Sequence, residues 1–329
     1  MTVISGVVNC NSSLVVSRGG LLRGVGGRQA VLCAGNSGVN PVVRVEKADF
    51  DNTYPDFSPS AVIENLIIDG KGMGVTGILL ENVVHCHIRN VTIRNCDVGI
   101  HIRDVKGCWS ECNTLKHIRM VNVKKGIVFT TTGYGGVGRP GNSAAFTTIE
   151  DVDITLADNV SGCVGIQIGG KQIVNNSDPK DNDSDEKVIA PFGDCPVFVD
   201  AYSSHLRVVV RLGNLGGCGL SVINGFLHFA QAHLTVIGHN NPTDIGIDLQ
   251  EAHKYKAYTD SAGVGYPTAG IDYVFIFYSQ FSQNAIVSNK LVAVEKGFML
   301  VTLDVPSQNR VCRDSADPTE IDIDVKSLT

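Results

Sequence analysis

Two aspartates, Asp151 and Asp153, flank one apolar residue in a stretch that alternates apolar and polar side chains. Such alternation predicts a β-strand that places both carboxylates on one face, about 6.8 Å apart along the strand. A pair of carboxylates can serve as general acid and base, for example at a glycosidic bond. This stretch is therefore the first candidate for a catalytic site.

Two related stretches each carry a histidine and an arginine in the same alternating pattern, His117 with Arg119 and His205 with Arg207. If Ile118, Val152 and Leu206 all point inward, the aspartates lie on a strand between these two stretches, about 4.8 Å from each. Arginine forks suit the carboxylates of uronates or sialates, and an imidazole can transfer protons. The expected site combines the catalytic residues Asp151, Asp153 and His205 with the substrate-binding residues His117, Arg119 and Arg207.

A structural explanation of the same residues is the alternative. Opposite charges on neighbouring strands stabilise a sheet and discourage lateral aggregation without doing any chemistry. The long polar segment 169–198 separates the aspartates from His205, so the alignment of these strands is the step that depends most on the fold.

These strands belong to an internal repeat. The stretch Ile63–Asp69 recurs as Ile88–Arg94, and looser copies follow around residues 118, 152, 206, 234 and 274. Between the copies lies a second unit, a glycine followed by alternating apolar residues, at Gly77, Gly99, Gly126, Gly165, Gly219 and Gly246. Two strand types that return in a fixed order indicate a solenoid whose coils stack on one another. We predict an all-β right-handed parallel β-helix with loop insertions, and an antiparallel sandwich is the alternative.

The coil sequences also carry a resemblance. The run Ile63–Gly70, followed by Gly77-Ile78, Asn90–Cys96 and Gly99-Ile100, resembles the pectate-lyase-like superfamily of right-handed β-helices. That group includes polysaccharide lyases, polygalacturonase-type hydrolases, sugar epimerases and phage tailspikes, so the resemblance implies a glycan-related role. The chain lacks the Asn-Thr-Asp, Asp-Asp, Gly-His-Gly and Arg-Ile-Lys motifs of a polygalacturonase-type site. The resemblance therefore fixes no reaction.

The repeat defines the expected domain organisation. We expect one β-helix domain over residues 1–329, with regular coils at about 55–305, an N-terminal coil or cap at 1–54 and a C-terminal cap at 306–329. Three insertions interrupt the coils at 130–145, 169–198 and 250–270. Insertions of a solenoid often cluster on one face and border a binding groove.

The insertion 169–198 contains a candidate metal site. Asp181, Asp183 and Asp185 alternate as at the start of a calcium loop, because a hard cation needs several oxygen ligands from one tight turn. Glu186 and Phe192 stand where that loop requires glycine and glutamate, so a solvated acidic loop is the alternative. Apart from this calcium hypothesis we expect no cofactor.

Composition narrows the class of partner. Charged residues make up 18 % of the chain and the formal net charge is −6, without a basic block, which argues against nucleic acid. No stretch approaches about 20 uninterrupted apolar residues, so we expect no membrane span. The ten cysteines are scattered among apolar neighbours and are predicted to be small buried hydrophobes.

Three classes of function remain. The chain could be a glycoside hydrolase or polysaccharide lyase acting on an acidic polysaccharide, a non-catalytic virion spike or adhesin, or a structural β-helix protein. We expect a protein that binds a polysaccharide or cell-surface glycan and could cleave it. Residues Met1–Ile4 show no secretion signal, yet such a role places the protein outside the cell or on a virion surface. The resemblance to spikes implies a homotrimer as one assembly.

Overall fold

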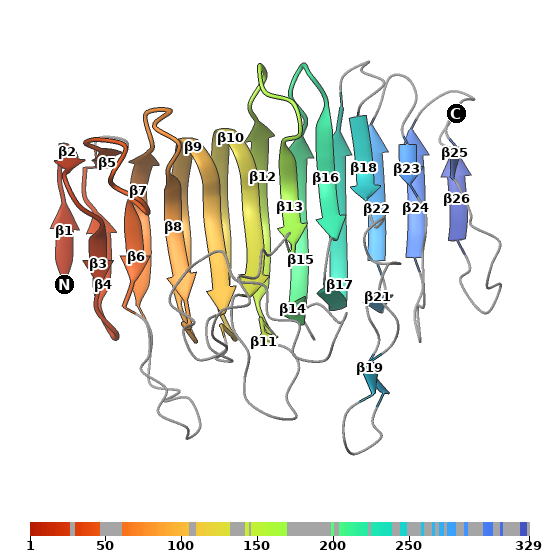
Figure 1. Ribbon diagram of the computed structural model, residues 1–329, viewed down its shortest axis with the longest axis horizontal. Helices are drawn as coiled ribbons and strands as arrows, with labels where there is room; N and C mark the ends of the chain where they lie inside the picture. Colours follow the sequence, from red (N-terminus) through yellow and green to blue (C-terminus); the bar gives the residue numbers. More distant parts are fainter. Residues whose placement is uncertain are drawn as a thin grey trace, which may run out of the picture.

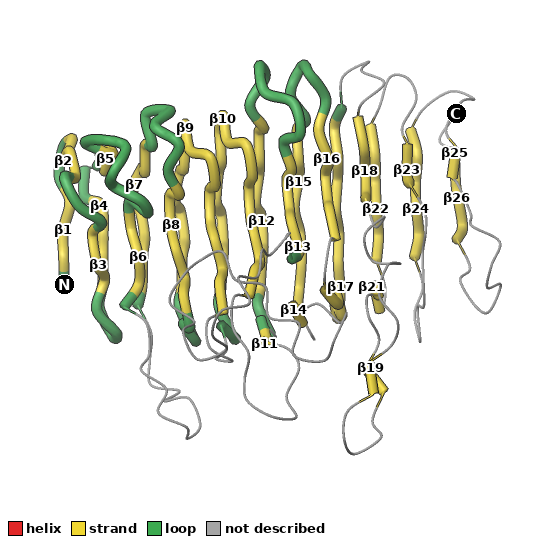
Figure 2. Tube along the Cα trace, in the orientation of Figure 1, coloured by secondary structure: helices red, strands yellow, loops and turns green. Residues whose placement is uncertain are grey.

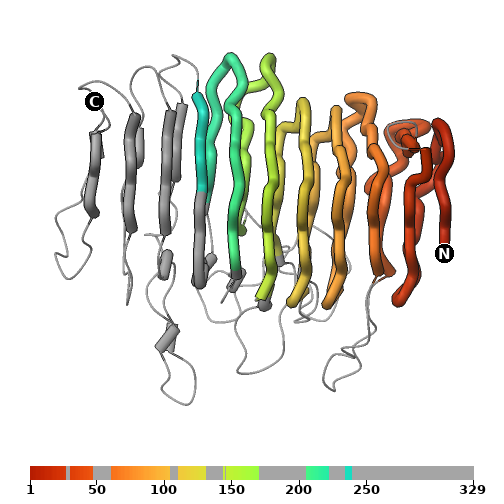
Figure 3. The backbone as a smooth tube through the Cα atoms, turned by 180° about the vertical axis from the view of Figure 1, so that it is seen from behind, coloured from red at the N-terminus to blue at the C-terminus, as the bar shows by residue number. Residues whose placement is uncertain are grey.

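The computed structural model describes residues 1–26, 30–46, 61–104, 110–131, 142–144, 146–169, 199–200, 204–222, 225–238 and 244–248, and short strands between residues 258 and 327. These residues form strands and turns and include no helix (Figure 2). The strands run across the long axis of the molecule and are stacked along it, from β1 (Thr2–Ile4) at one end to β26 (Ile323–Ser327) at the other (Figure 1). Figure 3 shows the same stack from behind. The fold class is therefore all-β, as predicted.

One stack of parallel strands carries the candidate site. It runs from β1 (Thr2–Ile4) through β4 (Leu21–Gly24), β7 (Val62–Asp69), the first half of β9 (His87–Asp104), the first half of β10 (Thr114–Thr131), β12 (Thr148–Leu156), β15 (Ser204–Arg211) and β17 (Gly225–Ile237) to β22 (Phe275–Gln280), β24 (Met299–Asp304) and β26 (Ile323–Ser327). We call the outer side of this stack from β4 to β17 the first face.

A second parallel stack contains the glycine strands. It runs from β3 (Leu14–Val16) through β6 (Val43–Val45), β8 (Thr76–Glu81), the second halves of β9 and β10, β13 (Val164–Ile168), β16 (Gly217–Val222) and β18 (Asp244–Asp248) to β23 (Ile286–Ser288) and β25 (Arg310–Val311). The outer side of β8 to β16 is the glycine-strand face. Strands of the two stacks run in opposite directions (Figure 1), as consecutive segments of a coil must.

Smaller sets of strands complete the pairing. Two of these sets are parallel: β2 (Val7–Cys10) with β5 (Val31–Ala34) and the end of β7, and β11 (Asn142–Ser143) with β14 (Val199–Asp200), the start of β17 and β21 (Gly270–Asp272). The short strands β19 (Tyr258–Thr259) and β20 (Gly265–Tyr266) form an antiparallel pair within the expected insertion 250–270. This arrangement is consistent with a solenoid and excludes the antiparallel sandwich for the described residues.

The core consists of apolar columns that continue from coil to coil. One column contains Leu66, Val91, Ile118, Val152, Val208 and Leu234, each at most 2 % exposed. A second, on the glycine strands, contains Ile78, Ile100, Ile127, Ile166 and Leu220, all fully buried. Each side chain therefore packs on its equivalents in the neighbouring coils, which is how a solenoid buries apolar surface.

The glycines at the start of the glycine strands are required by close backbone approach. A Cβ on Gly99 would lie 2.7 Å from the carbonyl oxygen of Gly126, and a Cβ on Gly126 would lie 2.5 Å from that of Gly165. Since a Cβ cannot come within 3.0 Å of a backbone oxygen without displacing it, no side chain fits in this column. Close packing of the backbone thus explains why glycine recurs at this position of the repeat.

The described cysteines behave mostly as the sequence predicts. Six are buried, namely Cys10, Cys33, Cys86, Cys96, Cys163 and Cys218, while Cys112 is half-buried. Burial raises the pKa of both Cys86 and Cys96 to about 12, so these thiols stay protonated at neutral pH. Among the described residues no helix has the length and apolar character needed to cross a bilayer.

Candidate functional site

The first face bends once in each of four successive coils. The bend residues are Asn65, Asn90, His117 and Asp151, with φ of 59°, 54°, 53° and 52°. Asn, Asp and His tolerate this left-handed conformation better than most residues. The backbone conformation therefore explains the residue types in this column, including His117 and Asp151, which the sequence suggested as site residues.

The bend also changes which residues point outward. Strand pairing passes over each bend residue, so that Lys116 pairs with Glu150 and Ile118 with Val152 while His117 and Asp151 are left out of the register. Two adjacent residues, such as Glu150 and Asp151, consequently face solvent where simple alternation predicts one.

Strand β15 lacks this bend, and here the predicted alignment is wrong. Ile149 pairs with Leu206 and Val152 with Val208, so only Arg207 stands opposite both Glu150 and Asp151. His205 lies opposite Thr148 and is not the partner of Asp151, and Val209 rather than Arg207 lies opposite Asp153. The error arose because His117-Ile118-Arg119 and His205-Leu206-Arg207 look alike although the second coil is one residue shorter at this point.

The structure nevertheless brings three of the predicted residues together. The Asp151 carboxylate lies 3.3 Å from Nδ1 of His117 on one side and 3.5 Å from Nε of Arg207 on the other. Its side chain is 37 % exposed, so these are surface contacts with little effect on stability. Asp153 contacts Arg211 at 3.4 Å, a partner that the sequence analysis did not identify because it depends on the corrected register.

A buried acid lies on the same face and was also missed. Glu64 is 2 % exposed and accepts hydrogen bonds from Arg23 and Arg89, its register neighbours on β4 and β9. Burial alone would raise the pKa of Glu64, but the hydrogen bonds from the two guanidinium groups outweigh it and hold the pKa below its ordinary value of 4.5. The matching charges at position 64 and at its neighbours in the repeat were the sequence signal.

A second polar row continues along the edge of this face. Asp69 accepts hydrogen bonds from Nε of Arg94 at 2.7 Å and from the Asn95 amide at 3.0 Å, and Asn122 donates to Asn95 at 2.8 Å. Burial raises the pKa of Asp69, but the hydrogen bonds from Asn95, the Lys71 backbone and Arg94 together lower it below 3.8. The charges of Asp69 and Arg94 are thus paired with each other.

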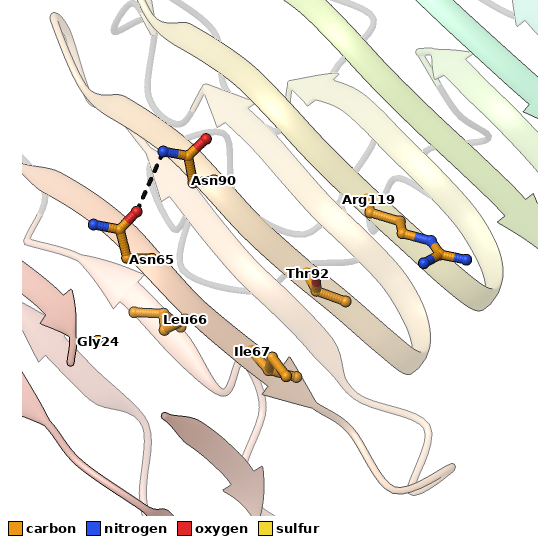
Figure 4. A pocket seen from close by; sticks show the side chains of 7 residues that line it. All are labelled: Gly24, Asn65, Leu66, Ile67, Asn90, Thr92 and Arg119. Carbon is orange, nitrogen blue, oxygen red and sulfur yellow. Dashed lines mark hydrogen bonds between the residues drawn. The ribbon is translucent and has the colours of Figure 1, made fainter. Parts of the chain in front are cut away.

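An open groove of about 720 Å³ lies on the first face. It is lined by Gly24, Asn65, Leu66, Ile67, Asn90, Thr92 and Arg119, contributed by β4, β7, β9 and β10. Figure 4 shows two rows of side chains: the amides of Asn65 and Asn90, joined by a 3.2 Å hydrogen bond, and the row that leads from Ile67 through Thr92 to Arg119. Of the predicted site residues, only Arg119 lines this groove.

Arg119 differs from the other cations of the first face. Arg23, Arg89, Arg94, Lys116, Arg207 and Arg211 each contact a carboxylate within 4.0 Å. Arg119 is exposed, and within the described part of the chain it has no hydrogen-bond or ion-pair partner, although Asp153 is its register neighbour on β12. One guanidinium group is thus available to an anion beside the groove.

The described residues give no support to a metal site. They contain no group of three His, Cys, Asp or Glu residues placed to hold a metal ion. The calcium hypothesis at Asp181, Asp183 and Asp185 lies outside the described residues.

Scans against protein-family models, curated proteins and solved structures each found no match. The geometry of the first face is therefore the guide to function.

Proposed function

We propose that this protein is a right-handed parallel β-helix that binds an acidic glycan in the groove of its first face, outside the cell or on a virion surface. The observation that carries the proposal is the unpartnered Arg119 beside an open groove, on a face whose other described cations are paired. A guanidinium group presents a planar fork that matches a carboxylate. Exposed amides and a hydroxyl beside it suit the hydroxyl groups of sugars.

The geometry favours binding over cleavage. Hydrolysis of a glycosidic bond requires carboxyl groups on both sides of that bond, yet the residues that line the groove include no acid. The Asp151 carboxylate is ion-paired with His117 and Arg207, and the Asp153 carboxylate with Arg211. His205 lies away from both aspartates in the register. Asp151 instead forms exposed ion pairs with His117 on β10 and Arg207 on β15.

A glycan array followed by affinity measurements on two arginine variants tests this function. Arg119→Ala should weaken binding of the acidic glycans about tenfold, because a charge-assisted contact contributes about 1.5–3 kcal/mol. Arg44→Ala is the matched control, since Arg44 on β6 is also exposed and without a partner among the described residues but lies away from the groove. The loss should shrink as salt is added.

Two results would contradict the proposal. The first is equal binding by wild type and Arg119→Ala, and the second is an equal loss in Arg44→Ala, which would indicate a nonspecific charge effect. Reducing-end and unsaturated-product assays on the bound glycan should stay negative, because the groove supplies no general acid. If one of these assays were positive and Asp151→Asn abolished the activity, the protein would be an enzyme with Asp151 in its active site.

A further inference from the structure

We infer that the groove selects a glycan with a single carboxylate beside neutral sugars, rather than a polymer that is charged at every residue. This inference rests on the proposed function and adds the pattern of charge along the ligand. It follows from how the polar groups are distributed along the groove and just beyond its ends.

Positive charge is available at one end of the groove. From β4 to β10 the groove crosses three strand spacings, about 14 Å in all. Arg119 lies at the β10 end. Beside the rest of the groove, Arg23 on β4 and Arg89 on β9 are both bonded to the buried Glu64 of β7, which lies just before the bend. The two guanidinium groups share this one carboxylate, so the cluster keeps a net positive charge, but neither group is free. A second carboxylate over β4 or β7 would have to compete with the buried Glu64 for them.

The middle of the groove is suited to a neutral sugar. The Nδ2 group of Asn90 donates to Oδ1 of Asn65, which leaves Nδ2 of Asn65 as a donor and Oδ1 of Asn90 as an acceptor without partners among the described residues. A donor and an acceptor side by side match vicinal hydroxyl groups. Ile67 and Thr92, both half-buried, offer methyl groups to the C–H face of a ring.

Paired charges border the groove on its far side. Beyond Arg119 the next strand carries Asp153 as its register neighbour, with Asp151 two residues earlier, and both side chains are partly exposed. Both acids are paired, Asp151 with Arg207 and Asp153 with Arg211, so a ligand carboxylate placed over β12 would find no free cation there. The free cation is therefore bounded by amides on one side and by paired charges on the other, which limits the favourable register to one anionic sugar.

Three defined probes separate this pattern from the general function. Sialyllactose carries one carboxylate and two neutral sugars, lactose carries none, and trigalacturonate carries one on every sugar. Titration calorimetry on the full chain should give the tightest binding for sialyllactose, roughly tenfold tighter than for lactose, as expected when one charge-assisted contact is added.

Variants assign each part of the preference. Arg119→Ala should remove the advantage of sialyllactose over lactose, because it weakens sialyllactose binding far more than lactose binding. Asn65→Gly and Asn90→Gly should weaken both ligands equally, since glycine keeps the left-handed bend while removing the amide. Asn122→Gly, at another left-handed position outside the groove, is the control and should bind as wild type does.

The outcomes distinguish this inference from the function on which it rests. Binding of trigalacturonate at least as tight as that of sialyllactose, and dependent on Arg119, would overturn the single-carboxylate pattern while keeping acidic-glycan binding. Failure of all three probes to bind the wild-type protein would overturn both. Equal losses in Asn65→Gly and Asn122→Gly would show that the amides act through the fold, and this too would overturn the inference.

Discussion

The first face and the glycine-strand face share the same parallel stacking but differ on their outer sides. On the first face, charged side chains of neighbouring strands contact one another, as Lys116 and Glu150 do at 2.8 Å, and Arg119 is exposed. On the glycine-strand face the corresponding outward residues are largely hidden from solvent: Val128, Gln167 and Ser221 are 4 %, 6 % and 8 % exposed. A ligand from solvent can therefore reach the first face but not this part of the other.

The two faces differ in what holds their neighbouring strands together. The glycine strands approach so closely that backbone packing excludes any side chain from the glycine column. The first face has room for long side chains and uses ion pairs and amide hydrogen bonds between coils. Recognition is expected where side chains are free to meet a ligand, while the glycine column tolerates little change.

The largest effect is expected from Gly126→Ala. The new methyl group would lie 2.5 Å from the Gly165 carbonyl oxygen and 2.7 Å from Cδ1 of Ile154, which should lower the free energy of unfolding by about 3 kcal/mol. Gly38→Ala is the control, because its methyl group meets only the end of the Asn36 side chain. Denaturant unfolding of both variants makes the measurement, and an equal loss would show that the column is not special.

A smaller loss is expected from Glu64→Gln. The substitution keeps the shape but removes the charge between Arg23 and Arg89, and should cost about 2 kcal/mol in denaturant unfolding. In the exposed pair with Lys116, Glu150→Gln should leave stability unchanged. If both variants unfolded alike, burial of Glu64 would not be what makes its ion pairs matter.

The pH dependence of stability should report the same buried acids. Glu64 and Asp69 have lowered pKa values in the folded state, so the unfolded chain takes up their protons first as the pH falls. Their stabilisation is present above the ordinary pKa and is lost on acidification through the lowered one. The free energy of unfolding should therefore decrease from about pH 5 to about pH 3. Glu64→Gln should flatten this decrease, and an unchanged slope would count against the assignment.

The smallest effect on stability is expected from two cysteine variants that compare access to the faces. Arg119→Cys should react rapidly with a maleimide, while Ser221→Cys should react slowly because position 221 is buried. Peptide mapping by mass spectrometry separates these sites from the native thiols, of which Cys86 and Cys96 should stay unlabelled in both variants. Equal labelling of the two positions would remove the distinction between an open and a covered face.

Much of the stacking followed from the sequence. The glycine units identified in the sequence lie in register, since apolar and glycine positions repeat without a change in length along these strands. The residues two positions after each glycine form one column: Leu79, His101, Val128, Gln167 and Ser221. The site was less predictable. A left-handed residue such as Asp151 breaks alternation, and its loss in β15 places Val209 opposite Asp153, where Arg207 was expected. The ion-pair partner of Asp153 is consequently Arg211. Glu64 could be found as a charge in the repeat, but its burial depends on two guanidinium groups from other coils.

The missing bend residue in β15 shifts the outer side chains of this strand by one position but leaves the inner side chains in place. The interior lattice passes through it unbroken, because Val152 packs on Val208 and Ile154 is paired with Val210. The outer lattice loses one site, so a polymer lying across the coils in step with β7, β9 and β10 falls out of step at β15. The loss of one residue can thus end a binding surface partway along the stack of strands, because the outer side chains change register while the packing of the core continues.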